Sequence, residues 1–123
     1  MRPVNLARAA MVTWALQFGS AVAAERTNWK VEVFLDDLCE QSTGVWIDNH
    51  KSGCERLDNL PDIRSIKATG DDLNARCGWN VFACENTECQ KGWELQKDIC
   101  LRVGVGDLKD AIKSYIVVET PCV

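Results

Sequence analysis

The same order of landmarks occurs twice along the chain, in residues 29–69 and again in residues 77–123. Each segment has an early aromatic, a cysteine, a tryptophan, a second cysteine and a closing run of isoleucine, a basic residue and serine. In order, these are Phe34, Cys39, Trp46, Cys54 and Ile63-Arg64-Ser65 in the first segment, and Phe82, Cys89, Trp93, Cys100 and Ile112-Lys113-Ser114 in the second. Landmarks that stay in register indicate two copies of one supersecondary unit, here called repeat one and repeat two. The polar residues 70–76 between them predict a connector.

Short β-strands are the predicted structure of both repeats. Apolar and charged side chains alternate over residues 29–33, and Trp79-Asn80-Val81 repeats the alternation, as expected of strands with one face on a core. The two tryptophan segments and the two closing segments, 63–68 and 112–119, add further short strands. The pattern therefore predicts four short strands per repeat and a single all-β domain.

Residues 1–24 have the features of a cleaved secretory signal peptide. Arg2 and Arg8 form a basic start, an apolar stretch without charge follows, and small residues precede a cut after Ala24. The alternative is a membrane anchor, but the apolar stretch is shorter than the roughly 20 residues that a bilayer-spanning helix needs. We therefore expect a secreted, extracellular chain of residues 25–123 without stable membrane insertion.

Seven cysteines in so short a chain favour an oxidising compartment and a framework of disulfides. The net charge of −4 becomes more acidic once the signal is removed, which disfavours binding to nucleic acid and to anionic lipid surfaces. His50 is the single histidine, so the commonest acid-base group of enzymes is nearly absent. These features favour a protein that is not an enzyme.

The repeats resemble the βγ-crystallin-like family, whose domains consist of two Greek-key motifs. Phe34 and Phe82 match the early aromatic of each motif, and the two closing segments match the family's Ile-basic-Ser pattern. Some small secreted microbial and fungal proteins with killer-toxin activity are similar, with cysteine replacing the hairpin aromatic as Cys39 and Cys89 do here. The resemblance implies a disulfide-stapled β-sandwich that covers nearly the whole mature chain.

Calcium-binding members of the family place two adjacent Asn or Asp residues just before the closing strand. Leu60-Pro61 and Lys109-Asp110 stand at these places, so each half site lacks negative charge. We expect no cofactor and no tight metal site. The remaining oxygen donors that the resemblance suggests as weak calcium candidates are Asp62, Ser65, Asp110 and Ser114.

Equivalent positions in duplicated units should meet equivalent partners, so we expect one disulfide within each repeat. The predicted pairs are Cys39 with Cys54 and Cys89 with Cys100. Closing a loop of this size stabilises the fold by about 3 kcal/mol in the chain-entropy model.

The third predicted disulfide follows from the Greek key, in which the fourth strand lies beside the first. If these strands are antiparallel, Cys77 lies near Cys122, whereas Cys84 lies at the opposite end of its strand. We therefore expect Cys77–Cys122 and an unpaired Cys84. That cysteine could be a buried free thiol, could exchange into a pair with Cys89, or could be reactive and form a dimer through an intermolecular bridge.

No set of residues in the sequence indicates a catalytic mechanism. The acidic pairs Asp36-Asp37 and Asp71-Asp72 could serve as glycosidase carboxylates, but both fall where turns favour Asp. Trp46 and His50 are the candidate binding residues, because an exposed tryptophan next to a polar histidine loop would suit a carbohydrate or protein contact.

The function we expect is binding of an extracellular protein or carbohydrate by a non-enzymatic cysteine-rich protein. Such a protein would be a microbial (fungal) effector or host-interaction protein. The first alternative, which the family resemblance suggests, is a killer-toxin-like antimicrobial that acts on competitor cells. The second is a calcium-stabilised structural protein, which would require a rise in melting temperature with calcium.

Overall fold

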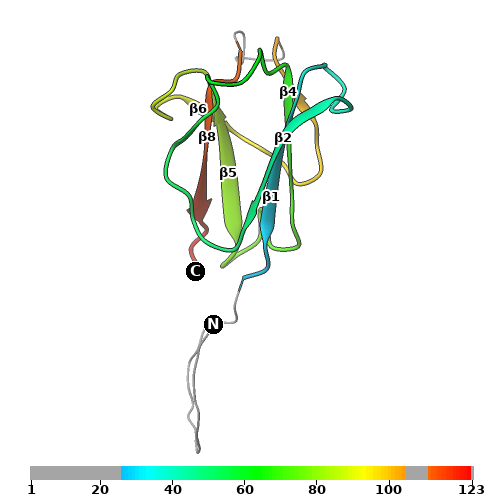
Figure 1. Ribbon diagram of the computed structural model, residues 1–123. Coiled ribbons are helices and arrows are strands. Elements are labelled where there is room, and N and C mark those ends of the chain that lie inside the picture. The colour runs from blue at the N-terminus through cyan, green and yellow to red at the C-terminus, as the bar shows by residue number, and fades with distance from the viewer. Residues whose placement is uncertain (1–25, 105–110, 123) are drawn as a thin grey trace, which may run out of the picture.

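The computed structural model describes residues 26–104 and 111–122, and in these residues it contains eight β-strands and no helix (Figure 1). The all-β prediction is therefore confirmed, while the predicted signal peptide lies outside the described residues. The strands of the first half are β1 (Trp29–Phe34), β2 (Ser42–Asp48), β3 (Glu55–Arg56) and β4 (Ser65–Thr69). Those of the second half are β5 (Trp79–Cys84), β6 (Gly92–Glu94), β7 (Leu101–Arg102) and β8 (Ser114–Glu119).

The strands form two antiparallel four-stranded sheets that face each other, with the orders β2-β1-β4-β7 and β3-β8-β5-β6 (Figure 1). Each half of the chain contributes three strands to one sheet and its third strand to the other. The third strands are only two residues long, and each joins the edge of the opposite sheet: β3 pairs with β8, and β7 pairs with β4. In both halves, the fourth strand lies beside the first.

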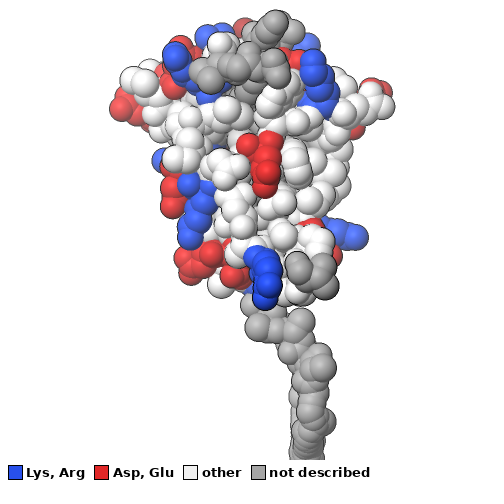
Figure 2. All heavy atoms as spheres, turned by 180° about the vertical axis from the view of Figure 1, so that it is seen from behind, with Lys and Arg blue, Asp and Glu red and all other residues white. Residues whose placement is uncertain are grey.

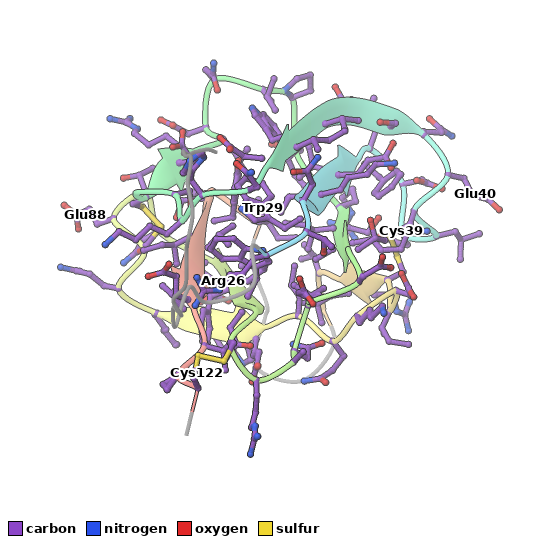
Figure 3. The ribbon with its side chains drawn as sticks, turned by 90° about the horizontal axis from the view of Figure 1, so that it is seen from below. Arg26, Trp29, Cys39, Glu40, Glu88 and Cys122 are labelled. Carbon is purple, nitrogen blue, oxygen red and sulfur yellow. A yellow bond between two sulfur atoms is a disulfide. The ribbon has the colours of Figure 1, made fainter. Side chains whose placement is uncertain are left out.

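The core lies between the sheets and draws on equivalent positions of both halves. Strands β1 and β5 have the same burial pattern, because their alternate side chains point inward from Trp29 and Trp79 onward. Figure 3 looks along the strands and shows Trp29 near the centre of these side chains. Both indole N–H groups are satisfied, since Trp29 donates to the carbonyl of His50 and Trp79 donates to that of Thr27. Burial of each large apolar side chain stabilises the fold by about 1.5–3 kcal/mol.

A buried serine fastens the first hairpin of each half to its sheet. The Ser65 hydroxyl donates to the carbonyl of Asp36, and the Ser114 hydroxyl donates to the carbonyl of Asn86. Both serines are fully buried, so these hydrogen bonds replace the ones to water that their hydroxyls lose on folding. The Asp36 carboxylate also accepts from the backbone N–H groups of residues 40 and 41, which closes its hairpin.

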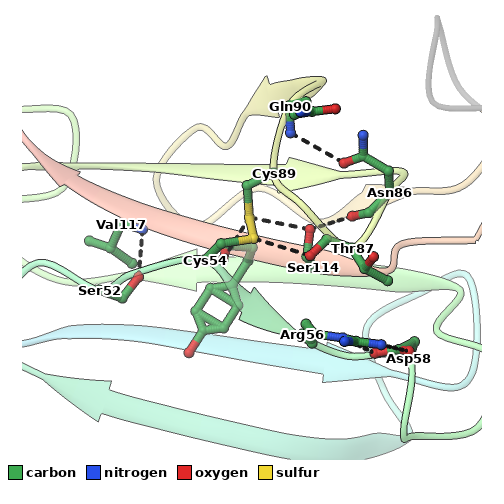
Figure 4. The surroundings of a disulfide bond; sticks show 11 residues. Ser52, Cys54, Arg56, Asp58, Asn86, Thr87, Cys89, Gln90, Ser114 and Val117 are labelled. Carbon is green, nitrogen blue, oxygen red and sulfur yellow. Dashed lines mark hydrogen bonds and ion pairs between the residues drawn. A yellow bond between two sulfur atoms is a disulfide. The ribbon is translucent and has the colours of Figure 1, made fainter.

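Two of the predicted disulfides are wrong. The structure joins Cys39 to Cys100 and Cys54 to Cys89, so each bridge connects the two halves instead of lying within one. The reason is the exchange of the third strands: Cys54 immediately precedes β3 and Cys100 immediately precedes β7. Each cysteine is carried with its strand to the other sheet, where it meets the hairpin of the opposite half. Figure 4 shows this for Cys54, which bonds Cys89 beside Ser114.

The remaining cysteines agree with the prediction. Cys77 and Cys122 form the third disulfide, because antiparallel β5 and β8 bring the start of one close to the end of the other. Cys84 is free and fully buried at the opposite end of β5. An exchanged pair with Cys89 is excluded in this structure, since Cys89 already bonds Cys54.

Candidate ligand-binding site

A pocket of about 290 Å³ opens where the chain crosses from β2 in one sheet to β3 in the other. Both sheets contribute to its walls, together with the segment of residues 51–53 that joins them. The lining residues are Trp29, Trp46, Ile47, Asp48, Lys51, Ser52, Gly53, Glu55 and Tyr115. The pocket is thus built on strands, with one short connection at its rim.

Three aromatic side chains line the pocket. Trp29 and Tyr115 are almost completely buried and lie with ring centroids 6.3 Å apart, edge to face. Trp46 is half-buried, and its ring centroid is 5.5 Å from that of Tyr115. The Trp46 ring lies over Gly44, where a Cβ atom would come within 2.8 Å of the indole. The missing side chain at Gly44 therefore makes room for the indole in this position.

Hydrogen bonds on both sides hold the rim segment in place. The Trp29 indole N–H donates to the His50 carbonyl at 2.7 Å. Farther along, the Ser52 N–H donates to the Val117 carbonyl. The Val117 N–H donates back to the Ser52 hydroxyl (Figure 4). The segment between β2 and β3 is thus fixed to both sheets before any ligand arrives, which lowers the entropy cost of binding.

Two carboxylates give the pocket a negative potential. The His50 imidazole lies 3.0 Å from Asp48, and this contact, with the Asn49 N–H, holds the pKa of the Asp48 carboxyl below its usual value. Burial raises the pKa of the Tyr115 phenol, and the charges of Glu55 and Asp48 raise it further. Both carboxylates therefore act on the tyrosine that lines the pocket.

Lys51 also lines the pocket and opposes this negative charge in part. Among the ion pairs formed within residues 26–104 and 111–122, none involves Lys51 or Glu55. The pocket thus has two carboxylates and one ammonium group at or near its rim. Within the described residues, only Asp48 of these three has a side-chain contact of this kind, with the exposed His50, which is charged only when protonated.

The structure places the two predicted binding residues in different roles. Trp46 lines the pocket, whereas His50 lies outside it and supports it through its carbonyl and its contact with Asp48. Sequence analysis missed Tyr115 and Glu55, which come from β8 and β3 in the opposite sheet. No local signal marks either residue, because Glu55 reaches Trp46 through the exchange of β3, and Tyr115 reaches it through the packing of one sheet on the other.

Among the calcium candidates that the structure describes, the two serine hydroxyls already have partners within the protein. Ser65 and Ser114 are buried and donate their hydroxyl hydrogens to hairpin carbonyls, while Asp62 is exposed. Asp110 lies outside the described residues. Within the part of the chain that the structure describes, no group of three or more His, Cys, Asp or Glu side chains is placed to hold a metal ion.

Three of the four carboxylates in the acidic pairs have structural partners, as turn residues should. The Asp36 carboxylate accepts hairpin N–H groups, which lower its pKa, and Asp37 forms an ion pair with Arg64. Asp72 accepts from the backbone N–H of Thr27. Asp36, Asp37 and Asp72 thus each stabilise the fold.

The face in Figure 2 has acidic and basic side chains side by side and shows no basic patch. No helix in residues 26–104 or 111–122 has the length and apolar character needed to span a bilayer. Comparison of the chain with protein families, with curated proteins and with solved structures gave no match.

Proposed function

We propose that this is a secreted, non-enzymatic binding protein whose two repeats are Greek-key units of the βγ-crystallin-like type. Two observations support this architecture: the fourth strand lies beside the first in both halves, and a buried serine anchors the equivalent hairpin in each. Three disulfides in a small domain are consistent with an extracellular location.

The pocket beside Trp46 is the observation that carries the binding function. It combines aromatic walls with a few charged groups, which is the usual composition of a ligand site. Its rim is tied to both sheets by hydrogen bonds, and two disulfides fasten the exchanged strands β3 and β7 to the hairpins of the sheets that they enter. Such a site keeps its shape in the absence of its ligand. The partner we propose is an extracellular protein or carbohydrate that inserts one small group here, as a microbial effector or host-interaction protein would require.

The test is an NMR titration of the oxidised protein, residues 25–123, with a panel of monosaccharides, amino acids and small amines. The indole N–H signals serve as reporters, because each tryptophan has its own environment. A ligand of this pocket should shift the signals of Trp29 and Trp46 and leave that of Trp93 unchanged.

Trp93 provides the matched control. It is half-buried and lies at the equivalent place of the second half, where Lys91 covers its ring, but it does not line the pocket. Trp46→Ala should abolish binding, whereas Trp93→Ala should retain it. Binding that survives Trp46→Ala, or a panel without any effect on these signals, would contradict the proposed function.

A further inference from the structure

We propose that the pocket beside Trp46 binds a quaternary ammonium group that carries no adjacent phosphate, as in free choline or a trimethylated lysine. This inference rests on the proposed function and specifies its ligand. The juxtaposition that carries it is three aromatic rings with the carboxylates of Asp48 and Glu55 around one small pocket.

The size of the pocket limits the ligand to a compact group. A volume of about 290 Å³ lies at the lower end of the range for ligand sites. Trp29 and Tyr115 are almost completely buried, so they form the closed inner side, and the half-buried Trp46 forms an outer wall. A single head group fits this shape better than an extended chain, which would need a groove.

The aromatic rings favour a cation with a weak hydration shell. The face of an indole or phenol ring carries a negative quadrupole that attracts cations, most strongly when water is excluded. A primary ammonium group loses strong hydrogen bonds to water on entering such a site, whereas a trimethylammonium group has none to lose and adds methyl contacts. The rings thus favour the methylated cation over a simple amine.

The two carboxylates come from different sheets, and both favour a cationic ligand, as the aromatic rings do. Asp48 ends β2 in one sheet and Glu55 begins β3 in the other, and both line the pocket. Asp48 is a carboxylate at physiological pH because of its ordinary acidity, and the His50 contact lowers its pKa further. A phosphate next to the bound cation would be repelled by both carboxylates, which disfavours a phosphocholine head group.

Lys51 is the element of the pocket that opposes a cation. It lines the same space and, among the described residues, forms no ion pair. If the ligand is cationic, removing the lysine charge must strengthen binding, whereas an anionic ligand would lose affinity. The sign of this effect therefore reports the charge of the ligand.

The experiment compares choline with 3,3-dimethyl-1-butanol, which has the same shape but no charge, by titrating each into the oxidised protein and following the Trp46 indole signal. Choline should bind roughly tenfold more tightly than its neutral isostere. Glu55→Gln should weaken choline about fivefold and leave the isostere unchanged, and Lys51→Gln should strengthen choline by a similar factor. Both substituted side chains are exposed, so these variants should fold.

Further ligands distinguish the sources of the cation. Nε-trimethyllysine should bind at least as well as choline and better than unmethylated lysine, and phosphocholine should bind more weakly than choline. If phosphocholine binds more tightly than choline, the inference about the source is overturned.

The inference and the proposed function can fail separately. If choline and its isostere bind equally, and Glu55→Gln and Lys51→Gln change nothing while Trp46→Ala abolishes binding, the cation inference is overturned and the proposed pocket stands. If quaternary ammonium ligands do not bind but a sugar binds in a Trp46-dependent manner, the cation inference is likewise overturned and the proposed pocket stands. If no compound depends on Trp46, both are wrong.

Discussion

The bridge between Cys39 and Cys100 connects the two halves of the molecule, so its removal should cost substantial stability. The two cysteines are 61 residues apart, and a loop of that length corresponds to about 4 kcal/mol in the chain-entropy model. The Cys54–Cys89 bridge lies inside this loop and shortens it to roughly 27 residues, for which the same relation gives about 3.5 kcal/mol. We therefore expect Cys39→Ala with Cys100→Ala to lower the free energy of unfolding by about 3.5 kcal/mol.

The measurement is urea unfolding of oxidised protein, followed by tryptophan fluorescence at 25 °C. The second double variant, Cys39→Ala with Cys54→Ala, serves as the discriminating control. It removes one partner from each of the two inter-half bridges, so it should lose more stability than the first variant or fail to fold. If the control variant is the more stable of the two, or if the first variant unfolds within about 1 kcal/mol of the parent, the reasoning about connectivity is refuted.

Three further predictions concern single residues. Ser114→Ala should lower the free energy of unfolding by about 1–3 kcal/mol in the same assay, because it leaves the Asn86 carbonyl without its buried donor; no loss would contradict the anchoring role. Gly78→Ala should cost about 2 kcal/mol or more, because its Cβ would overlap the Asp72 carbonyl oxygen, whereas Gly53→Ala has open space and should be nearly neutral. Burial raises the pKa of the Cys84 thiol, so this thiol loses its proton at a lower pH in the unfolded chain than in the folded protein. The free energy of unfolding should therefore fall as the pH rises above about 8.5, the pKa of an unperturbed thiol. Comparison of urea unfolding at neutral and alkaline pH should show a smaller fall for Cys84→Ala than for the parent; an equal fall would contradict the assignment.

The long strands could be predicted from the sequence because their signal is local. Alternation from Trp29 and from Trp79 marks β1 and β5, whose inward side chains form the core. The closing segment of the first half begins at Ile63 in the prediction, but β4 begins at Ser65. The backbone N–H of Arg64 bonds to the Phe34 carbonyl, so the chain is attached to β1 before the regular strand starts.

Four strands per half could be predicted from the sequence, but the position of the third strand in each half could not. Glu55-Arg56 has no hydrophobic alternation, and it is a strand only because β8 of the other half lies beside it. This pairing and that of β7 with β4 determined two disulfides, which therefore differ from the predicted pairs. The unpaired Cys84 and the Cys77–Cys122 bridge, by contrast, followed from the geometry of a single pair of strands.

The candidate site likewise combines a residue that could be predicted from the sequence with one that could not. Trp46 could be identified from its own neighbourhood, because it lies beside a polar loop with a histidine. The pocket needs Tyr115 as well, and this residue is far from Trp46 in the sequence but 5.5 Å away between ring centroids. A pattern of residues within one repeat contains no information about such a contact.

The exchange of β3 and β7 has a consequence for how the molecule responds to proteolysis. A cut between Thr69 and Gly78 would separate the polypeptide into two fragments, yet each fragment would still hold a strand of its own in the other's sheet. Cys39–Cys100 and Cys54–Cys89 would also keep the fragments covalently attached. A nicked molecule would therefore migrate as one species until a reductant is added, and nicking alone would leave the protein assembled.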